Sequence, residues 1–303
     1  MNISEETFTS WSQGPSKTEA EKCENAETAV KKAIAADEEL AKLDVSVFAQ
    51  GSYRGRTNVR QDSDVDICVR YNTAFFPEYP EGKTGKDFGH GDSALRFSDF
   101  KNKVERALKS YFGATSVARG KKAFDVHANS YRIDADVVPT YVHRRYSGNK
   151  NSDGSDHFYE GVAFLPDEGS LIKNWPEQTY DNGISRNDAT GRRHKRLIRI
   201  FKRLRNKMQE DNKPEASNIA SFLIECLVWN APLEAFQLLD ACKSCSLDIT
   251  FLGTQVDILN GRIVLTINSL KKRFDIVPGR IEQTLPNLSP WVWGFPTSTN
   301  SPP

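Results

Sequence analysis

The run Asp64-Val65-Asp66-Ile67 alternates carboxylates with branched apolar side chains, and this pattern constrains the fold more than any other in the chain. Successive side chains of a β-strand point to opposite faces. Asp64 and Asp66 therefore share one face, and the apolar residues between and after them share the other. The pattern predicts a strand with its apolar face on a core. Two adjacent carboxylates on a rigid strand suit a hard divalent cation.

A Gly-Ser turn precedes this strand. Residues 45–50 form a short apolar run that predicts another strand, and it ends in Gln50, Gly51 and Ser52. Backbone N–H groups and the hydroxyl of such a turn can bind phosphate oxygens. A lone Gly-Ser is usually only a turn, and a lone Asp-x-Asp is usually a solvated face. Here the Gly-Ser turn is followed by the Asp-x-Asp strand and then by another acidic strand, and this combination indicates a nucleotide-binding site.

The further acidic strand is predicted at residues 131–138, where Asp134 and Asp136 share one face. Three carboxylates on neighbouring strands are unfavourable unless cations neutralise them. In two-metal phosphoryl transfer, one ion activates the attacking hydroxyl and the other stabilises the leaving group. Either Asp136 or Asp134 could supply the third carboxylate, and spacing does not choose between them. The simpler interpretation of Asp134 is a solvent-facing or arginine-paired carboxylate.

These motifs resemble those of the cGAS/DncV-like nucleotidyltransferases of bacterial antiphage systems, a branch of the polymerase-β-like superfamily. The clade E enzymes (CdnE) are the most similar group. The resemblance runs through nine blocks: residues 11–13, 50–54, 57–60, 62–66, 104–108, 135–138, 174–176, 180–183 and 221–227. It implies an α+β fold of the polymerase-β type with two lobes. We expect a mixed-sheet catalytic lobe with an N-terminal bracing helix at residues 1–175, and a helical lobe with a C-terminal tail at residues 176–303.

The resemblance also implies an activity. The enzyme would make a cyclic dinucleotide second messenger without a template, from nucleoside triphosphates that include UTP and ATP. Asp64, Asp66 and Asp136 would be the catalytic ligands of two Mg²⁺ ions, with Mn²⁺ as an alternative metal. Gln50, Gly51 and Ser52 would bind the substrate. A separate effector protein would respond to the product.

Three residues outside these motifs are further substrate candidates. Asn174 lies in an Asn-aromatic-Pro block that clade E enzymes favouring pyrimidines share, and its amide can donate to and accept from the edge of uracil. The alternative is an ordinary turn residue. Lys202, on a basic helix, and Ser221, on the next helix, match a Lys and a Ser that contact the triphosphate in these enzymes. The alternative for the basic helix is a solvated face.

Periodicity outlines the rest of the chain. It predicts helices at residues 16–42, 97–112, 190–210, 217–230 and 233–243. In the first of these, Cys23, Ala26, Val30, Ala33 and Ile34 lie close to helical period. It also predicts a hairpin from strands at residues 124–127 and 131–138, and strands at 158–165 and 171–172. Polar composition predicts loops at residues 77–92, 144–157 and 176–190.

Composition limits the other functions. The net charge of +1 argues against binding of extended duplex, so we expect no nucleic-acid activator. The five cysteines include Cys242-x-x-Cys245 but no second Cys or His pair at zinc spacing, which indicates reduced thiols. No apolar run is long enough to cross a bilayer, so we expect a cytoplasmic protein with no membrane partner. The five histidines are scattered and are assigned to structural or surface positions. The alternatives are nucleotide transfer to an RNA or small-molecule acceptor, and a non-catalytic nucleotide sensor.

Overall fold

The computed structural model describes residues 3–59, 64–217, 219–231, 233, 236, 257–259 and 262–264. The chain forms two compact units. The first, which we call the catalytic unit, comprises Pro15–Gly55 and Asp62–Glu177. The second, which we call the helical unit, comprises Met1–Gly14, Arg56–Gln61 and Gln178–Pro303. The domain limits expected from the sequence, 1–175 and 176–303, stay a prediction.

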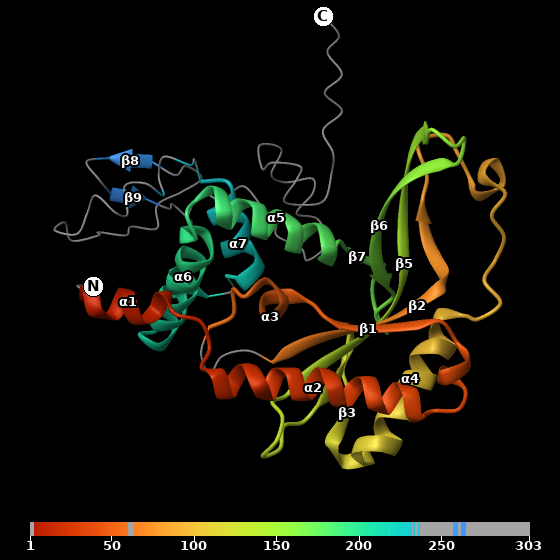
Figure 1. Ribbon diagram of the computed structural model, residues 1–303, viewed down its shortest axis with the longest axis horizontal. Coiled ribbons are helices and arrows are strands. Elements are labelled where there is room, and N and C mark those ends of the chain that lie inside the picture. Colours follow the sequence, from red (N-terminus) through yellow and green to blue (C-terminus); the bar gives the residue numbers. More distant parts are fainter. Residues whose placement is uncertain are drawn as a thin grey trace, which may run out of the picture. The chain divides into compact units, whose positions relative to one another are not determined.

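A seven-stranded mixed sheet forms the centre of the catalytic unit (Figure 1). Its main path runs β1 (Val45–Ala49), β2 (Val65–Glu78), β5 (Ala135–Lys150), β4 (Phe124–Val126) and β3 (Val117–Arg119). Off this path, β6 (Asp156–Phe164) pairs with the later part of β5, beyond the residues that pair with β4, and β7 (Ile172–Asn174) pairs with β6. The β2–β5 pair is parallel, and all the other pairs in this sheet are antiparallel.

Two long helices, α2 (Lys17–Ala36) and α4 (Phe97–Phe112), lie side by side against this sheet (Figure 1). The five residues that lie close to helical period in the first predicted helix are the ones that α2 buries. They join Val65, Ile67 and Phe100 in one core. Amphipathic spacing thus indicates which face of the helix packs, because the apolar stripe has only the sheet to cover it. The short 3₁₀ helices η1 (Leu40–Lys42), η2 (Gly85–Phe88) and η3 (Ala114–Ser116) lie in the connections.

Helices dominate the described part of the helical unit, and three of them build its core. They are α1 (Glu5–Ser12), α6 (Arg193–Glu210) and α7 (Ser221–Trp229). The 3₁₀ helix η4 (Pro214–Ala216) and a separate hairpin of β8 (Asp257–Leu259) and β9 (Arg262–Val264) complete the elements. The helix predicted at residues 233–243 falls outside the described residues except for Leu233 and Phe236. Within the described residues, no helix is both long and apolar enough to span a membrane.

Two predicted loops are wrong. Residues 144–157 are mostly strand, because β5 continues to Lys150 and β6 starts at Asp156. The long polar side chains there cover aromatic rings instead of marking a loop: the Arg144 guanidinium lies 4.4 Å from the ring centre of Phe75 and 4.7 Å from that of Phe158.

The predicted connector at residues 176–190 is the helix α5 (Pro176–Ala189). No residue of α5 is buried, so the helix lacks the apolar stripe by which periodicity would identify it. Proline in the first turn and Glu177 beside it are helix-start signals that were available in the sequence.

Candidate active site

The parallel pairing of β2 with β5 brings two of the predicted carboxylates together. Its register sets Asp66 opposite Asp136 and Val65 opposite Ala135. Val65 and Ala135 are buried in the core, whereas Asp66 and Asp136 are half-buried on the other face. Asp64 directly precedes β2 and is exposed. The strand edge therefore presents acidic side chains to one side only, as the alternation in the sequence predicts.

The Gly-Ser turn lies against the same carboxylates. The N–H of Gln50 donates to the backbone oxygen of Asp66 at 2.8 Å, and Gly51 then opens the short helix α3 (Gly51–Gly55) with φ +63°. A Cβ on Gly51 would lie closer than 3.0 Å to Oδ2 of Asp66 and 3.1 Å from its Cγ. Glycine is thus required twice, once for the backbone conformation and once for the close approach to the carboxylate. Ser52 follows within α3, half-buried.

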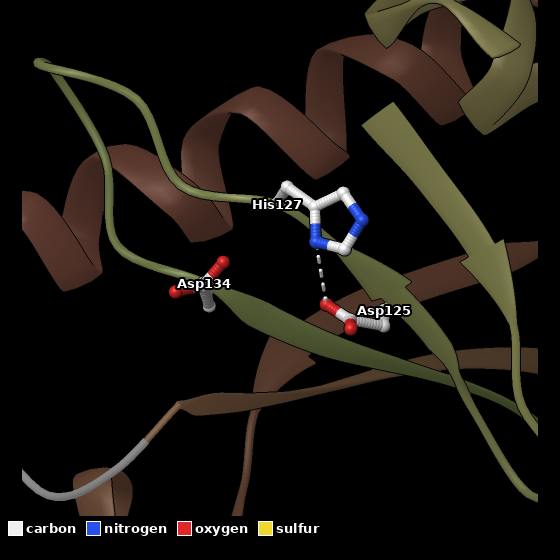
Figure 2. Close-up of side chains that lie close together, drawn as sticks. All are labelled: Asp125, His127 and Asp134. Carbon is white, nitrogen blue, oxygen red and sulfur yellow. Dashed lines mark ion pairs between the residues drawn. The ribbon is translucent and has the colours of Figure 1, made fainter. Parts of the chain in front are cut away.

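A third strand adds acidic and imidazole groups to this face. In the antiparallel β4–β5 pair, Asp125 lies opposite Asp136. His127 follows two residues after Asp125, and Asp134 precedes Asp136 by two. Figure 2 shows Asp125, His127 and Asp134 gathered at this end of the hairpin. One donor atom from each of the three lies within 4.8 Å of the others.

The sequence reasoning missed Asp125 and His127, although a signal was present. Both residues alternate with buried apolar neighbours, and a hairpin joining 124–127 to 131–138 was predicted. A hairpin closing between residues 127 and 131 would pair Asp125 with Ile133, whereas the structure sets Asp125 opposite Asp136. The neighbour of Asp125 could therefore be identified only from the structure. Asp134 keeps an additional local role, since its Oδ1 accepts a hydrogen bond from the N–H of Ala128 at 2.6 Å.

Burial and neighbouring carboxylates disfavour the ionised forms of the aspartates on this face. Partial desolvation, followed by the charges of Asp134 and Asp125, raises the pKa of Asp64 above the usual aspartate range. Burial, followed by the charges of Asp64 and Asp125, raises the pKa of Asp136. In the described part of the chain, no lysine or arginine lies within 4.0 Å of these four carboxylates.

Another carboxylate of the same unit shows the contrast. Asp167 lies 2.9 Å from Arg119 and 2.7 Å from Lys101, and these two cations lower its pKa to about 2. Asp167 is thus neutralised by neighbouring side chains. The described residues supply no such partner to Asp64 and Asp136, and an acidic face without side-chain cations is typical of metal-dependent sites.

Asn174 lies apart from the acidic strands, at the end of β7. Two strands, β5 and β6, separate β7 from β2 in the sheet. Asn174 is exposed, whereas the following Trp175 is buried and packs edge-on against the ring of His143 at 5.3 Å. The buried tryptophan fixes the end of the strand and leaves the neighbouring amide accessible.

Lys202 and Ser221 belong to the helical unit. The Lys202 side chain is buried, and its ammonium group lies 2.6 Å from Oε1 of Glu225 and 3.2 Å from the backbone oxygen of Thr57. The Thr57 hydroxyl donates to the same Glu225 oxygen at 2.8 Å. Ser221 accepts a hydrogen bond from Arg205 at 3.1 Å.

The partners of Lys202 were not identified from the sequence. Glu225 is the only charged residue in the otherwise mostly apolar run 221–229, and a buried carboxylate on such a helix needs a cationic partner. This lone charge could have indicated from the sequence that Glu225 pairs with a cation. The local segment around Thr57, which supplies the remaining acceptor, could be located only from the structure.

Known proteins match both parts of the chain. The sequence model of the cGAS/DncV-like nucleotidyltransferase C-terminal helical domain matches residues 181–273. A cyclic dipyrimidine nucleotide synthase CdnE from Legionella pneumophila is 45% identical over 255 residues, which cover 84% of this chain and 85% of that protein. The chain belongs to the CdnE group of cGAS/DncV-like nucleotidyltransferases.

Solved structures of CdnE enzymes agree with this membership. The Rhodothermus marinus CdnE c-UMP-AMP synthase, solved with Apcpp and Upnpp, is 33% identical with a TM-score of 0.67, and the match covers 77% of each chain. The Elizabethkingia meningoseptica CdnE cyclic dinucleotide synthase, solved with GTP and Apcpp, is 37% identical with a TM-score of 0.61 over 78% of each chain. The predicted α+β, polymerase-β-like fold and the nucleotidyltransferase class are confirmed.

Proposed function

We propose that this CdnE-group nucleotidyltransferase joins two nucleoside triphosphates into a cyclic dinucleotide that contains a pyrimidine. The carrying observation is the β2–β5 register, which sets Asp66 opposite Asp136 beside the Gly51 turn. The relatives support the choice of product. Two CdnE proteins that are 45% identical to this chain are cyclic dipyrimidine nucleotide synthases, and the R. marinus relative is a cyclic UMP-AMP synthase. A cyclic dipurine nucleotide synthase is 38% identical, which lies between the dipyrimidine pair at 45% and the R. marinus relative at 37%.

The donor set fits magnesium. Asp64, Asp66 and Asp136 offer only carboxylate oxygens, which Mg²⁺ prefers, and the absence of a Cβ at Gly51 leaves the turn close against Asp66. Bound there, two Mg²⁺ ions would neutralise the triphosphate and lower the pKa of the attacking hydroxyl. The paired strands β2 and β5 hold Asp66 and Asp136 in fixed positions, and Asp64 directly precedes β2, so little reorganisation is needed when the substrate arrives.

The reaction forms one phosphodiester bond in each of two steps. A ribose hydroxyl of one nucleotide attacks the α-phosphorus of the other, the bond to pyrophosphate breaks, and the hydroxyl proton is released. The linear intermediate repeats the same step on its second triphosphate and closes the ring. Gln50, Gly51 and Ser52 are assigned to holding the triphosphate through the turn, so catalysis depends on positioning and electrostatics.

Three more residues complete the proposed substrate contacts. We assign Asn174 to the edge of a pyrimidine base, because its amide is exposed and can both donate and accept. Lys202 and Ser221 are assigned to the triphosphate. An ammonium group has three N–H donors, and among the described residues Thr57 and Glu225 engage two of those of Lys202. We assign the third donor to a phosphate oxygen. The product would act in antiphage signalling through a separate effector.

The test is an incubation of the purified protein with magnesium and labelled nucleoside triphosphates, singly and in pairs. Phosphatase treatment follows, and mass spectrometry identifies the resistant product. We expect a cyclic product containing uridine. The double variant Asp64→Asn, Asp66→Asn should form none, whereas Asp153→Asn, an exposed aspartate in the turn between β5 and β6, should retain full activity.

Other outcomes would replace the proposal. A resistant product made only of purines would keep the reaction and discard the pyrimidine assignment. Turnover that requires an added RNA or small molecule would indicate nucleotide transfer to an acceptor. Tight triphosphate binding without pyrophosphate release would indicate a sensor.

A further inference from the structure

The cluster of Asp125, His127 and Asp134 lies beside the proposed magnesium ligands but is not used by them. Asp125 is on β4, His127 directly follows this strand, and Asp134 directly precedes β5. Because Asp125 lies opposite Asp136 in the antiparallel pair, one further step of the same register brings His127 level with Asp134. Three metal-ligating side chains thus converge from the two sides of one hairpin (Figure 2).

Backbone hydrogen bonds hold the segments that carry these side chains. The N–H of His127 donates to the oxygen of Ser116 at 3.0 Å, and the N–H of Ala128 donates to Asp134 at 2.6 Å. The side-chain oxygen of Asn129 accepts from two N–H groups of the following turn, both at 2.9 Å. The loop that joins His127 to Asp134 is therefore preorganised before any ligand arrives.

The charge of the cluster is a separate observation, and it points to a cation. Asp125 lies beside His127, with 3.5 Å between its Oδ1 and the Nδ1 of the imidazole. Lysine and arginine lie beyond 4.0 Å from both Asp125 and Asp134 in the described part of the chain. Among the described residues, neighbouring Asp64 and Asp136 likewise have no lysine or arginine within this distance. An excess of negative charge on one face, next to an imidazole ligand, favours a bound divalent ion.

The donor set differs from that of a magnesium site. Imidazole nitrogen binds first-row transition metals well and magnesium poorly, and carboxylates bind both. Ligand atoms about 2.1 Å from one metal lie at most about 4.2 Å from one another. The three donor atoms here lie within 4.8 Å of one another, so small side-chain rotations would bring them to the distances that one metal ion requires. His127 and Asp125 are about half exposed, which leaves a path for the ion to enter.

We propose that Asp125, His127 and Asp134 bind one divalent transition-metal ion, at a site distinct from the carboxylates assigned to magnesium. The ion links the end of β4 to the start of β5. It also reduces the negative charge around Asp136, since Asp125 lies between the two sites in the register. The ion thus fixes the end of β4 against the start of β5 and screens the charge of Asp136. The proposal does not depend on the proposed synthesis of a cyclic dinucleotide.

The test measures Mn²⁺ binding to the full-length protein by electron paramagnetic resonance, in excess Mg²⁺, which saturates an all-oxygen site. Four proteins are compared: wild type, Asp64→Asn/Asp66→Asn, His127→Gln and His157→Gln. His157 is the matched control, because it is a partly exposed histidine of the same unit whose Nδ1 contacts the Ser147 hydroxyl at 2.9 Å. Circular dichroism verifies that each variant folds.

We expect one Mn²⁺ site that persists in excess Mg²⁺ and in the double aspartate variant. His127→Gln should weaken the binding by at least about tenfold, and His157→Gln should leave it unchanged. Equal Mn²⁺ affinity in His127→Gln would overturn the site. Loss of all Mn²⁺ binding in Asp64→Asn/Asp66→Asn would also overturn it, because the metal would then belong to the magnesium ligands.

Discussion

Replacement of Gly51 by alanine tests how closely the turn must approach the acidic strand. Gly51 has φ +63°, a conformation that costs a residue with a Cβ about 1–2 kcal/mol. For a unit of this size, each kcal/mol lowers Tm by about 2–4 °C, so we expect a loss of about 2–8 °C. The new methyl group would also lie closer than 3.0 Å to Oδ2 of Asp66, so the carboxylate must move.

The displaced carboxylate should affect catalysis more than stability. A shift of about 1 Å in a catalytic group costs about 100-fold in rate, so kcat for pyrophosphate release should fall by about that factor. Gly82→Ala is the matched control. Gly82 also has positive φ, at +74°, but nothing lies within 4 Å of the position of its Cβ. This variant should lose a similar few degrees in a thermal melt and keep its kcat.

Two results would refute this reasoning. If Gly51→Ala kept kcat within about threefold of wild type, contact between the turn and Asp66 would be irrelevant to the reaction. If Gly82→Ala lost as much activity as Gly51→Ala, the effect would come from backbone strain in general and not from the displaced carboxylate.

Three further predictions concern charge and base recognition. Asp136→Asn should raise Tm in metal-free buffer at neutral pH. A carboxylate whose pKa is raised in the folded state destabilises the fold once it ionises, and asparagine does not ionise. In thermal melts, the gain in Tm over wild type should shrink as the pH falls toward 3.8, the ordinary pKa of an aspartate. Glu225→Gln should lower the free energy of unfolding by about 3 kcal/mol in urea titrations, since Lys202 would remain buried without its counter-charge, and Lys202→Met in the same chain should restore most of the loss. Asn174→Ala should lower the share of uridine in the cyclic product, measured by mass spectrometry with equal concentrations of all four triphosphates, and should leave Tm unchanged because the side chain is exposed.

The sequence predicted the elements whose side chains alternate or repeat. The alternation around Asp66 predicted a strand with an acidic face, and helical spacing predicted α2, whose buried stripe has that spacing. These predictions succeeded because a core admits only apolar side chains, so burial leaves a period in the sequence. Where no residue is buried, as in α5, the period is absent and the helix was missed.

The candidate site could be predicted only in part, because strand pairing is not a local property. The sequence predicted that Asp64, Asp66 and Asp136 lie on neighbouring strands, but it did not reveal the register in which those strands pair. The position of Asp125 opposite Asp136 follows from the β4–β5 register, and the ion pair of Lys202 with Glu225 joins two helices. Both depend on tertiary packing, which a single sequence does not encode in its periodicity.

The parallel pairing of β2 with β5 has a consequence for the order of folding. Asp66 and Asp136 are neighbours in the sheet but are separated by 70 positions in the chain, counted as the difference of their numbers. Such a contact forms slowly, since the loop between the strands must close before the strands can pair. A ribosome-bound chain that has released β2 but not β5 lacks the carboxylate pair altogether. Under the proposed function, catalytic competence is therefore acquired late, and a partly synthesised protein cannot produce a premature signal.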